Sequence, residues 1–424
     1  MDDLSPLKQM ARYGKTTTTL GGMAVRLIGN QYLNTSLNHD AYAHVLVNTL
    51  GQLKGPLMKV AQFLATIPNA LPQEYAQTLL SLQSHAPAMG VPFVKRRMHA
   101  ELGADWEKRF KAFDLTARFA ASLGQVHQAE SHQGEVLACK LQYPGMDHLV
   151  SADLNQLKII FQLYEQFNSA IKTADIHQEI QDRLLEELDY VNEAQNLRRY
   201  AEFFQGHDNI KVPAVYEELS TKRLLTLSWV EGESIFQKLE HPQGYRDKLG
   251  ELLFQAWYLP FYQKGMIHAD PHPGNYRITQ DDPIHLTLLD FGCVRYFSSQ
   301  FIEGVKNLYV GLKENDQERM VHAYTQWGFQ NLTHNVIEAI TQWARLLYDP
   351  LLDDQVRPIQ TVQGDVGWKV AQNVHKTLNE EGGLRPPREF VFMDRASVGI
   401  GSVIMRLDAR QNWHRLFEEM IVKS

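Results

Sequence analysis

The chain has 424 residues, 44% of them apolar and 21% charged, a composition typical of a globular protein with sizeable cores. The net charge of -7 argues against a general role in binding nucleic acid. With only 2 cysteines, the sequence also argues against a disulfide framework or a cysteine-based zinc site, which suits a reducing compartment.

No run of about 18 or more apolar residues is present to span a bilayer. The best candidate, residues 252–267, is interrupted by Gln255, Gln263 and Lys264, so we expect a buried helix there. The N-terminus lacks the basic and apolar regions of a signal peptide, which predicts a cytoplasmic location.

Membrane contact is an open alternative at the N-terminus. Residues 4–39 carry several lysines and arginines and no aspartate or glutamate. This pattern is compatible with a weak interfacial helix, peripheral to the inner membrane, but we favour an ordinary helix packed on the protein body.

The first elements are helical and then give way to strands. A helix-period pattern runs through residues 41–61, and a further helix is predicted over residues 92–102. Residues 113–129 and 135–142 are short, β-branched and alternating, with Gly134 as a turn signal between them. These two segments predict a small antiparallel sheet.

The later elements are mainly helical. Helix is predicted over residues 150–205, 244–266 and from 297 onward, and strands over 211–216, 223–230, 276–279 and 285–289. The fold class is therefore α+β. The predicted domains are an N-terminal helical extension, a lobe with a small sheet and a helical insertion, and a helical lobe, over residues 1–110, 111–230 and 231–424.

Lys140 ends an apolar strand, Val-Leu-Ala-Cys-Lys over residues 136–140, close to the V-A-I-K pattern of kinases. A lysine in this position can pair with nucleotide phosphates. Taken alone the signal is weak, because a lysine at a strand end is more often simply solvated.

The segment from His268 to Asn275 matches H-x-D-x-x-x-x-N, the spacing of a kinase catalytic loop. In that interpretation Asp270 orients or deprotonates an acceptor, and Asn275 binds magnesium. Two alternatives stay open: a metal site formed by His268, Asp270 and His272, and a surface turn without function.

Asp290 begins a D-F-G tripeptide after an apolar strand, a short hairpin beyond Asn275. This is the arrangement of a kinase magnesium loop, with Asp290 as the principal metal ligand. The lysine, the catalytic loop and D-F-G occur in the chain order of a kinase. Together they predict a protein-kinase-like two-lobe fold that uses ATP and magnesium.

A kinase also needs a helix glutamate that holds the lysine in place. Glu193 lies in the right part of the chain, although the sequence alone does not single it out over Glu187. The alternative for both acids is a solvated helix face. The hairpin that covers the phosphates is unusual too, because residues 119–127 retain only Gly124 and are rich in alanine. We expect a stiffer loop that holds nucleotide differently.

These motifs resemble the UbiB/AarF family of atypical kinases, bacterial relatives of the mitochondrial coenzyme Q-supporting kinase-like proteins. The resemblance is carried by an alanine-rich loop, a lysine strand followed by Q-Y-P-G, an E-x-D, a helix glutamate and an H-x-D-P-H-P-G-N loop, found at residues 119–127, 139–145, 187–189, 193 and 268–275. Together the motifs are highly specific.

The family's K-x-G-Q signature corresponds to residues 59–62, where Ala61 replaces the glycine. The resemblance implies an N-terminal extension that lies over the active site and obstructs protein substrates. It assigns gating roles to four residues, Lys59, Gln62, Glu187 and Asp189. It also assigns nucleotide contacts beyond Lys140, namely Ala120, Ala121, Ser122, Gln125 and Val230.

A second departure is Phe119, where the family loop has alanine, and either substitution can change how the extension packs. The chain also lacks the C-terminal transmembrane helices of some bacterial members, so we expect at most a peripheral membrane protein. The resemblance implies ATP binding and ATPase activity rather than ordinary protein kinase activity.

The leading hypothesis is an atypical kinase-like ATPase or phosphotransferase that supports ubiquinone or other isoprenoid-lipid biosynthesis. Its implied partners are ATP and an isoprenoid lipid or quinone-pathway proteins. One alternative is a nucleotide-gated scaffold for lipid-pathway proteins with negligible turnover. Another is a small-molecule kinase similar to antibiotic phosphotransferases.

Overall fold

The computed structural model describes residues 88–120, 123–167, 173–330, 332–359 and 387–422, with some positions between 370 and 380. Residues 1–87 of the predicted N-terminal extension lie outside this part of the chain, as do Lys59, Gln62, Ala121 and Ser122. Contacts divide the chain into two compact units, with Met1–Ala194 and Val215–Trp229 in the first and Gln195–Ala214 and Val230–Ser424 in the second.

The first unit contains the predicted small antiparallel sheet. Its five strands run in the order β1-β3-β4-β6, with β2 paired to β3, and comprise β1 (Ala112–Phe113), β2 (Phe119–Ala120), β3 (Gly124–Glu130), β4 (Val136–Gln142) and β6 (Leu224–Ser228). Gly134 turns between β3 and β4 with a φ of 87°, a conformation that glycine adopts without strain.

One face of this sheet is covered by α5 (Val91–Leu102) and the short helix η1 (Trp106–Arg109). Val94 and Met98, at helical spacing on α5, point into a common core with Leu137 of β4, and each of the three is at most 1% exposed. The rings of Trp106 and Phe113 meet edge to face at 5.2 Å. This core holds β4 in place.

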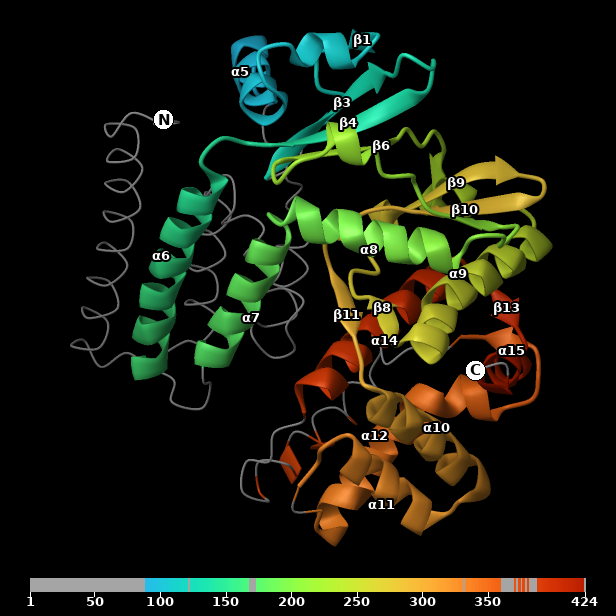
Figure 1. The fold of residues 1–424 in the computed structure, drawn as a ribbon. Helices are drawn as coiled ribbons and strands as arrows, with labels where there is room; N and C mark the ends of the chain where they lie inside the picture. Colours follow the sequence, from blue (N-terminus) through green and yellow to red (C-terminus); the bar gives the residue numbers. More distant parts are fainter. Residues whose placement is uncertain are drawn as a thin grey trace. The chain divides into compact units, whose positions relative to one another are not determined.

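The helical insertion follows β4 and is divided into three helices. The first two, α6 (Met146–Phe167) and α7 (Thr173–Glu186), lie side by side (Figure 1). The third, α8 (Tyr190–Phe203), begins after a turn at residues 187–189 and continues from the first unit into the second. The prediction of helix over residues 150–205 is therefore correct in type but missed these breaks.

The second unit has a small sheet of its own in the order β5-β10-β9-β7, formed by β5 (Ile210–Lys211), β10 (Ile284–Leu288), β9 (Tyr276–Asp281) and β7 (Glu233–Ser234). The predicted strand over residues 211–216 is largely wrong. Only Ile210 and Lys211 form a strand, parallel to β10, and Val215 makes an isolated bridge to Leu227. Pro213 lacks the N–H that a continuous ladder needs.

The described part of the second unit also contains two further strand pairs, the short helices η3 (Ile235–Lys238) and η4 (Pro273–Asn275), and a set of longer helices. The pairs are β8 (Met266–His268) with β11 (Val294–Tyr296), and β12 (Arg357–Pro358) with β13 (Arg410–Gln411). The longer helices are α9 (Gln243–Lys264), α10 (Ser299–Glu314), α11 (Gln317–Gln326), α12 (His334–Leu352), α14 (Arg388–Arg406) and α15 (Trp413–Val422) (Figure 1).

Helix α9 is the buried helix that the sequence predicted. Leu253, Phe254 and Phe261 are fully buried, and Gly265 ends the helix in the left-handed conformation, with a φ of 65°. The chain then enters β8, which leads to the catalytic-loop motif. Within the described residues, no helix has the length and apolar character needed to cross a bilayer.

Candidate functional site

Lys140 and Glu193 form an ion pair in the first unit. The lysine Nζ lies 2.9 Å from both carboxylate oxygens. The Glu193 side chain is 3% exposed and that of Lys140 is 28% exposed, so the glutamate is buried while the lysine stays accessible to solvent. A lysine held in this way keeps a positive charge at a fixed place, as phosphate binding requires.

The local structure explains why Glu193, and not Glu187, reaches the lysine. Asp189 begins α8, and its Oδ1 accepts a hydrogen bond from the backbone N–H of Asn192 at 3.0 Å, the pattern of an N-cap. Glu193 consequently lies in the first turn of α8, whereas Glu187 lies in the preceding turn. Asp189, the aspartate of the E-x-D motif, thus caps α8 and helps to align Glu193 with Lys140.

The surroundings of the pair restrict Lys140 further. Its ammonium lies 5.2 Å from the centre of the Tyr190 ring, within cation–π range. Gly124 lies close by, and a Cβ built there would be 2.7 Å from the Leu141 carbonyl oxygen. The one glycine retained in the alanine-rich hairpin is therefore required for close packing of β3 against β4.

The register of β3 and β4 separates the predicted nucleotide contacts. Val126 is paired with Lys140 and shares its face of the sheet, whereas Gln125 is paired with Leu141 on the opposite face. Gln125 is 2% exposed, and its side chain is hydrogen-bonded to His127 at 2.8 Å and to the Met89 N–H at 2.7 Å. The structure does not bring Gln125 to the lysine. Simple strand alternation would have pointed to Val126 instead.

Two more of the predicted nucleotide contacts, Ala120 and Val230, lie in the described part of the chain. Ala120 ends β2 opposite Gln125, and Val230 is half-buried just beyond β6 and belongs to the second unit. Phe119, which departs from the family's alanine, is 61% exposed and stacks on Trp229 at 6.2 Å. Cys139 is buried, and burial raises the pKa of its thiol to about 12, in keeping with a small core filler.

In the second unit, two residues of the catalytic-loop motif, Asp270 and Asn275, are hydrogen-bonded to each other. The Asn275 Nδ2 donates to the Asp270 Oδ2 at 2.9 Å and to the Asp270 backbone oxygen at 3.0 Å. Both amide hydrogens are directed at Asp270, so the Oδ1 of Asn275 faces away from it. The backbone oxygen of Asn275 also accepts from the Leu289 N–H at 2.7 Å, which ties this loop to the D-F-G segment.

Asp290 stands in the left-handed backbone conformation, with a φ of 56°. Aspartate is one of the few residues with a side chain that adopt this conformation at low cost. Phe291 follows it and is fully buried, with its ring centre 4.9 Å from that of Tyr200. The buried phenylalanine anchors the loop and leaves the aspartate backbone turned sharply at the strand end.

The two histidines of the catalytic-loop motif are hydrogen-bonded to backbone groups. The His268 Nε2 lies 2.7 Å from the Asp290 carbonyl oxygen, which can only accept, so the proton is on Nε2. The His272 Nδ1 accepts from the Gly274 N–H at 3.0 Å. Within the described residues no three His, Cys, Asp or Glu side chains are grouped to hold a metal, so the alternative site of His268, Asp270 and His272 is not formed.

Tyr276 lies beside the loop and is fully protonated at ordinary pH. Burial raises the pKa of its phenol above the usual value, and the Asp270 carboxylate raises that pKa further. Tyr276 therefore stays uncharged beside the Asp270 carboxylate.

The family model of the ABC1 atypical kinase-like domain matches residues 81–324, more than half of the chain and all of the site residues described above. The chain belongs to the ABC1 atypical kinase-like family. This confirms the resemblance to the UbiB/AarF family, because relatives carry the name AarF domain-containing protein kinase.

Relatives extend over much of the chain. It is 29% identical over 361 residues to the protein Activity of BC1 complex kinase 7, chloroplastic, of Arabidopsis thaliana, covering 83% of this chain and 50% of the relative. It is 31% identical over 253 residues to AarF domain-containing protein kinase 1 of Mus musculus, covering 58% and 48%. The chain thus spans about half the length of these two relatives.

A solved structure of Rv3197 from Mycobacterium tuberculosis, in complex with erythromycin, has the same fold. The TM-score is 0.62 at 25% identity, and the match covers 90% of this chain and 96% of the other. The predicted α+β protein-kinase-like fold is confirmed.

Asn196 is a site residue of this ABC1-family chain that the sequence did not reveal. It is 1% exposed, and its Nδ2 donates to the Phe291 backbone oxygen at 3.0 Å. Its Oδ1 accepts from the Tyr296 hydroxyl at 2.7 Å. Asn196 lies one turn after Glu193 on α8, so a single helix carries the partner of Lys140 and a residue that holds the D-F-G loop.

We expect Asn196→Asp to raise the magnesium concentration needed for half-maximal ATP binding by about tenfold, a typical effect of losing a residue that supports metal ligands. The carboxylate keeps the shape but cannot donate to the Phe291 oxygen. The matched control is Tyr296→Phe, which removes a hydroxyl and leaves the bond to Phe291 intact. Magnesium titrations that shift equally in both variants would contradict this role.

Proposed function

We propose that the chain binds ATP with magnesium and activates its γ-phosphoryl group for transfer to water or to a small hydroxyl acceptor. The observation that carries this is the Lys140–Glu193 pair in the first unit together with the Asp270–Asn275 pair and Asp290 in the second. These are the charged and polar groups that phosphoryl transfer requires, in kinase order.

The donor set of the second unit suits magnesium. Asn275 and Asp290 offer an amide and a carboxylate oxygen, the hard oxygen ligands that magnesium prefers, and phosphate oxygens and water complete its usual shell. The amide hydrogens of Asn275 are fixed on Asp270, which orients its oxygen away from that carboxylate. When bound, magnesium would neutralise phosphate charge.

In this proposal the protein residues hold the phosphates, orient the acceptor and accept one proton from it. Lys140, held by Glu193, pairs with phosphate oxygens and withdraws negative charge. Asp270 is held at Oδ2 by Asn275, so its Oδ1 is the atom that orients the acceptor hydroxyl and takes its proton. His268 fixes the Asp290 carbonyl and so keeps the metal-binding carboxylate in place.

The finer assignments are extensions of this proposal. We assign Lys59, Gln62, Glu187 and Asp189 to gating of the nucleotide, and the lobes to residues 111–230 and 231–424, following the UbiB/AarF resemblance. Support of ubiquinone or isoprenoid-lipid biosynthesis, at a cytoplasmic or peripheral membrane location, is inferred from the same source.

Removal of magnesium tests the binding part of the proposal. We expect ATP affinity, measured by calorimetry or with a fluorescent ATP analogue, to fall at least about tenfold when the metal is chelated, because the phosphates lose their main counter-charge. Calcium, with its longer ligand distances, should restore binding only in part. Equal affinity with and without magnesium would overturn the assignment of Asn275 and Asp290.

A further inference from the structure

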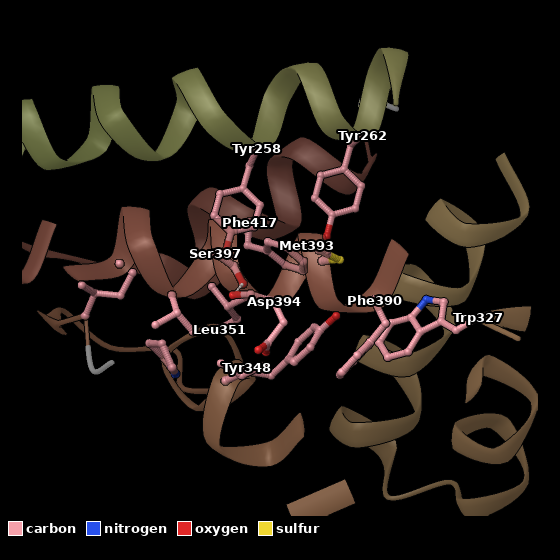
Figure 2. A pocket seen from close by; sticks show the side chains of 15 residues that line it. Tyr258, Tyr262, Trp327, Tyr348, Leu351, Phe390, Met393, Asp394, Ser397 and Phe417 are labelled. Atoms are coloured by element: carbon pink, nitrogen blue, oxygen red, sulfur yellow. Dashed lines mark hydrogen bonds between the residues drawn. The ribbon is translucent and has the colours of Figure 1, made fainter. Parts of the chain in front are cut away.

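A pocket with a cavity of about 60 Å³ lies in the second unit, among α9, α12, α14 and α15 (Figure 2). Its wall is mainly aromatic and aliphatic and includes Tyr258, Trp327, Leu351, Phe390 and Phe417. None of the residues that line it belongs to the catalytic loop or to D-F-G. An apolar, concave site of this kind suits a small ligand with few polar atoms.

Two tyrosine hydroxyls in this pocket have no hydrogen-bond partner within the described part of the chain. Tyr262 is 5% exposed and Tyr348 is 7% exposed, and the hydroxyl oxygen of each is buried. Figure 2 shows the two hydroxyls pointing toward one another across the pocket. Burial raises the pKa of both phenols well above the ordinary value, so both keep the proton that they can donate.

A buried hydroxyl without a hydrogen-bond partner is unfavourable, so two of them in one pocket call for an acceptor. A neighbouring tyrosine shows the satisfied state, because the Tyr324 hydroxyl lies 2.9 Å from that of Thr341. An oxygen acceptor placed between Tyr262 and Tyr348 would satisfy both donors at once. The apolar wall would cover the rest of the ligand.

Helix α14 connects this pocket to the catalytic loop. Ser397, Val398 and Gly401 line the pocket, while Gly399 packs on Pro271, the residue after Asp270. The contact is tight, since a Cβ built at Gly399 would lie 2.3 Å from the Pro271 ring. Packed elements tend to shift as units, so α14 offers a direct physical connection between the pocket and the loop that carries Asp270.

We propose that this pocket binds the carbonyl end of a small aliphatic ketone or ester, and that its occupancy changes ATP turnover. The carbonyl oxygen accepts from the hydroxyls of Tyr262 and Tyr348, and the carbon chain contacts Trp327, Leu351 and Phe417. The cavity of about 60 Å³ exceeds the roughly 10 to 15 Å³ that a single water needs, so it admits a small carbonyl head group. The regulatory half of this inference rests on the proposed function, and the binding half does not.

The test is a titration of the full chain with 2-pentanone, followed by saturation-transfer NMR. We expect saturable millimolar binding, weakened at least fivefold in the double variant Tyr262→Phe, Tyr348→Phe. That variant loses only unpartnered hydroxyls, so its melting temperature should equal or exceed that of the original chain. The control Tyr324→Phe removes a partnered hydroxyl outside the pocket and should bind 2-pentanone normally.

Equal binding in the original chain and the double variant would overturn the site, as would the absence of saturable binding, which would mean that the cavity holds water alone. ATP hydrolysis with and without 2-pentanone decides the regulatory half, where we expect at least a twofold change. Binding without such a change overturns the regulatory half. A chain that hydrolyses no ATP in any sample refutes transfer to water and the regulatory half with it, while the titration alone decides binding.

Discussion

Asp290→Asn is expected to weaken magnesium-dependent binding of ATP at least about 100-fold, because the carboxylate is the only charged protein ligand assigned to the metal. Asparagine also adopts the left-handed backbone, so the φ of 56° at this position is preserved. The loss is therefore electrostatic and not conformational. Titration of ATP in the presence of excess magnesium measures it.

Asp408→Asn is the matched control for this variant. Asp408 also has a positive φ, of 49°, and its carboxylate pairs with Arg246 at 3.5 Å in an exposed place on the second unit. Exposed pairs of this kind contribute about 0 to 1 kcal/mol, so ATP binding should be unchanged in the control. If Asp290→Asn bound Mg-ATP as well as the original chain, the magnesium assignment would be wrong.

Lys140→Met should have the second large effect, on stability and on nucleotide binding together. It leaves the carboxylate of Glu193, which is only 3% exposed, without the lysine that now neutralises it. We expect a loss of about 2 to 3 kcal/mol in the free energy of unfolding, since one remaining charge of a largely buried pair is strongly unfavourable. Denaturant titration measures this loss.

A double variant separates the two effects. Lys140→Met with Glu193→Gln removes both charges and keeps similar shapes, so most of the lost stability should return. ATP binding should stay about 100-fold weaker than in the original chain, because the phosphate-pairing charge is still missing. Recovery of ATP binding together with stability would show that Lys140 acts on folding only.

The motifs of the second unit were predictable because their chemistry depends on short spacings. Asp270 and Asn275 are hydrogen-bonded within one loop, and Asp290 follows a hairpin, so the chain order alone places them near one another. The metal site suggested by His268 and His272 failed for a physical reason. Both imidazoles are engaged by backbone groups, and the sequence carries no sign of those bonds.

The first unit was harder to predict in detail. Whether Glu193 or Glu187 meets Lys140 depends on where α8 begins, and Asp189 caps that start by accepting a hydrogen bond from the Asn192 N–H. Gln125 was chosen because of its motif, although strand alternation turns it away from Lys140.

One missed residue depends on contacts between distant parts of the chain, and one wrong strand prediction has a local cause. Asn196 could not be found from sequence because its partners, Phe291 and Tyr296, lie about a hundred residues further along. The predicted strand at residues 211–216 failed because Pro213 interrupts the ladder, a local signal that outweighs the β-branched pattern.

The most direct test of the central claim is steady-state phosphate release from Mg-ATP by the original chain and by Asp270→Asn. If the chain is an enzyme, the original protein hydrolyses ATP and the variant loses about 100-fold or more in turnover, while ATP affinity stays within a few-fold. A chain that acts only as a nucleotide-gated scaffold would give negligible phosphate release, or the same release from both proteins, and either result would contradict the account.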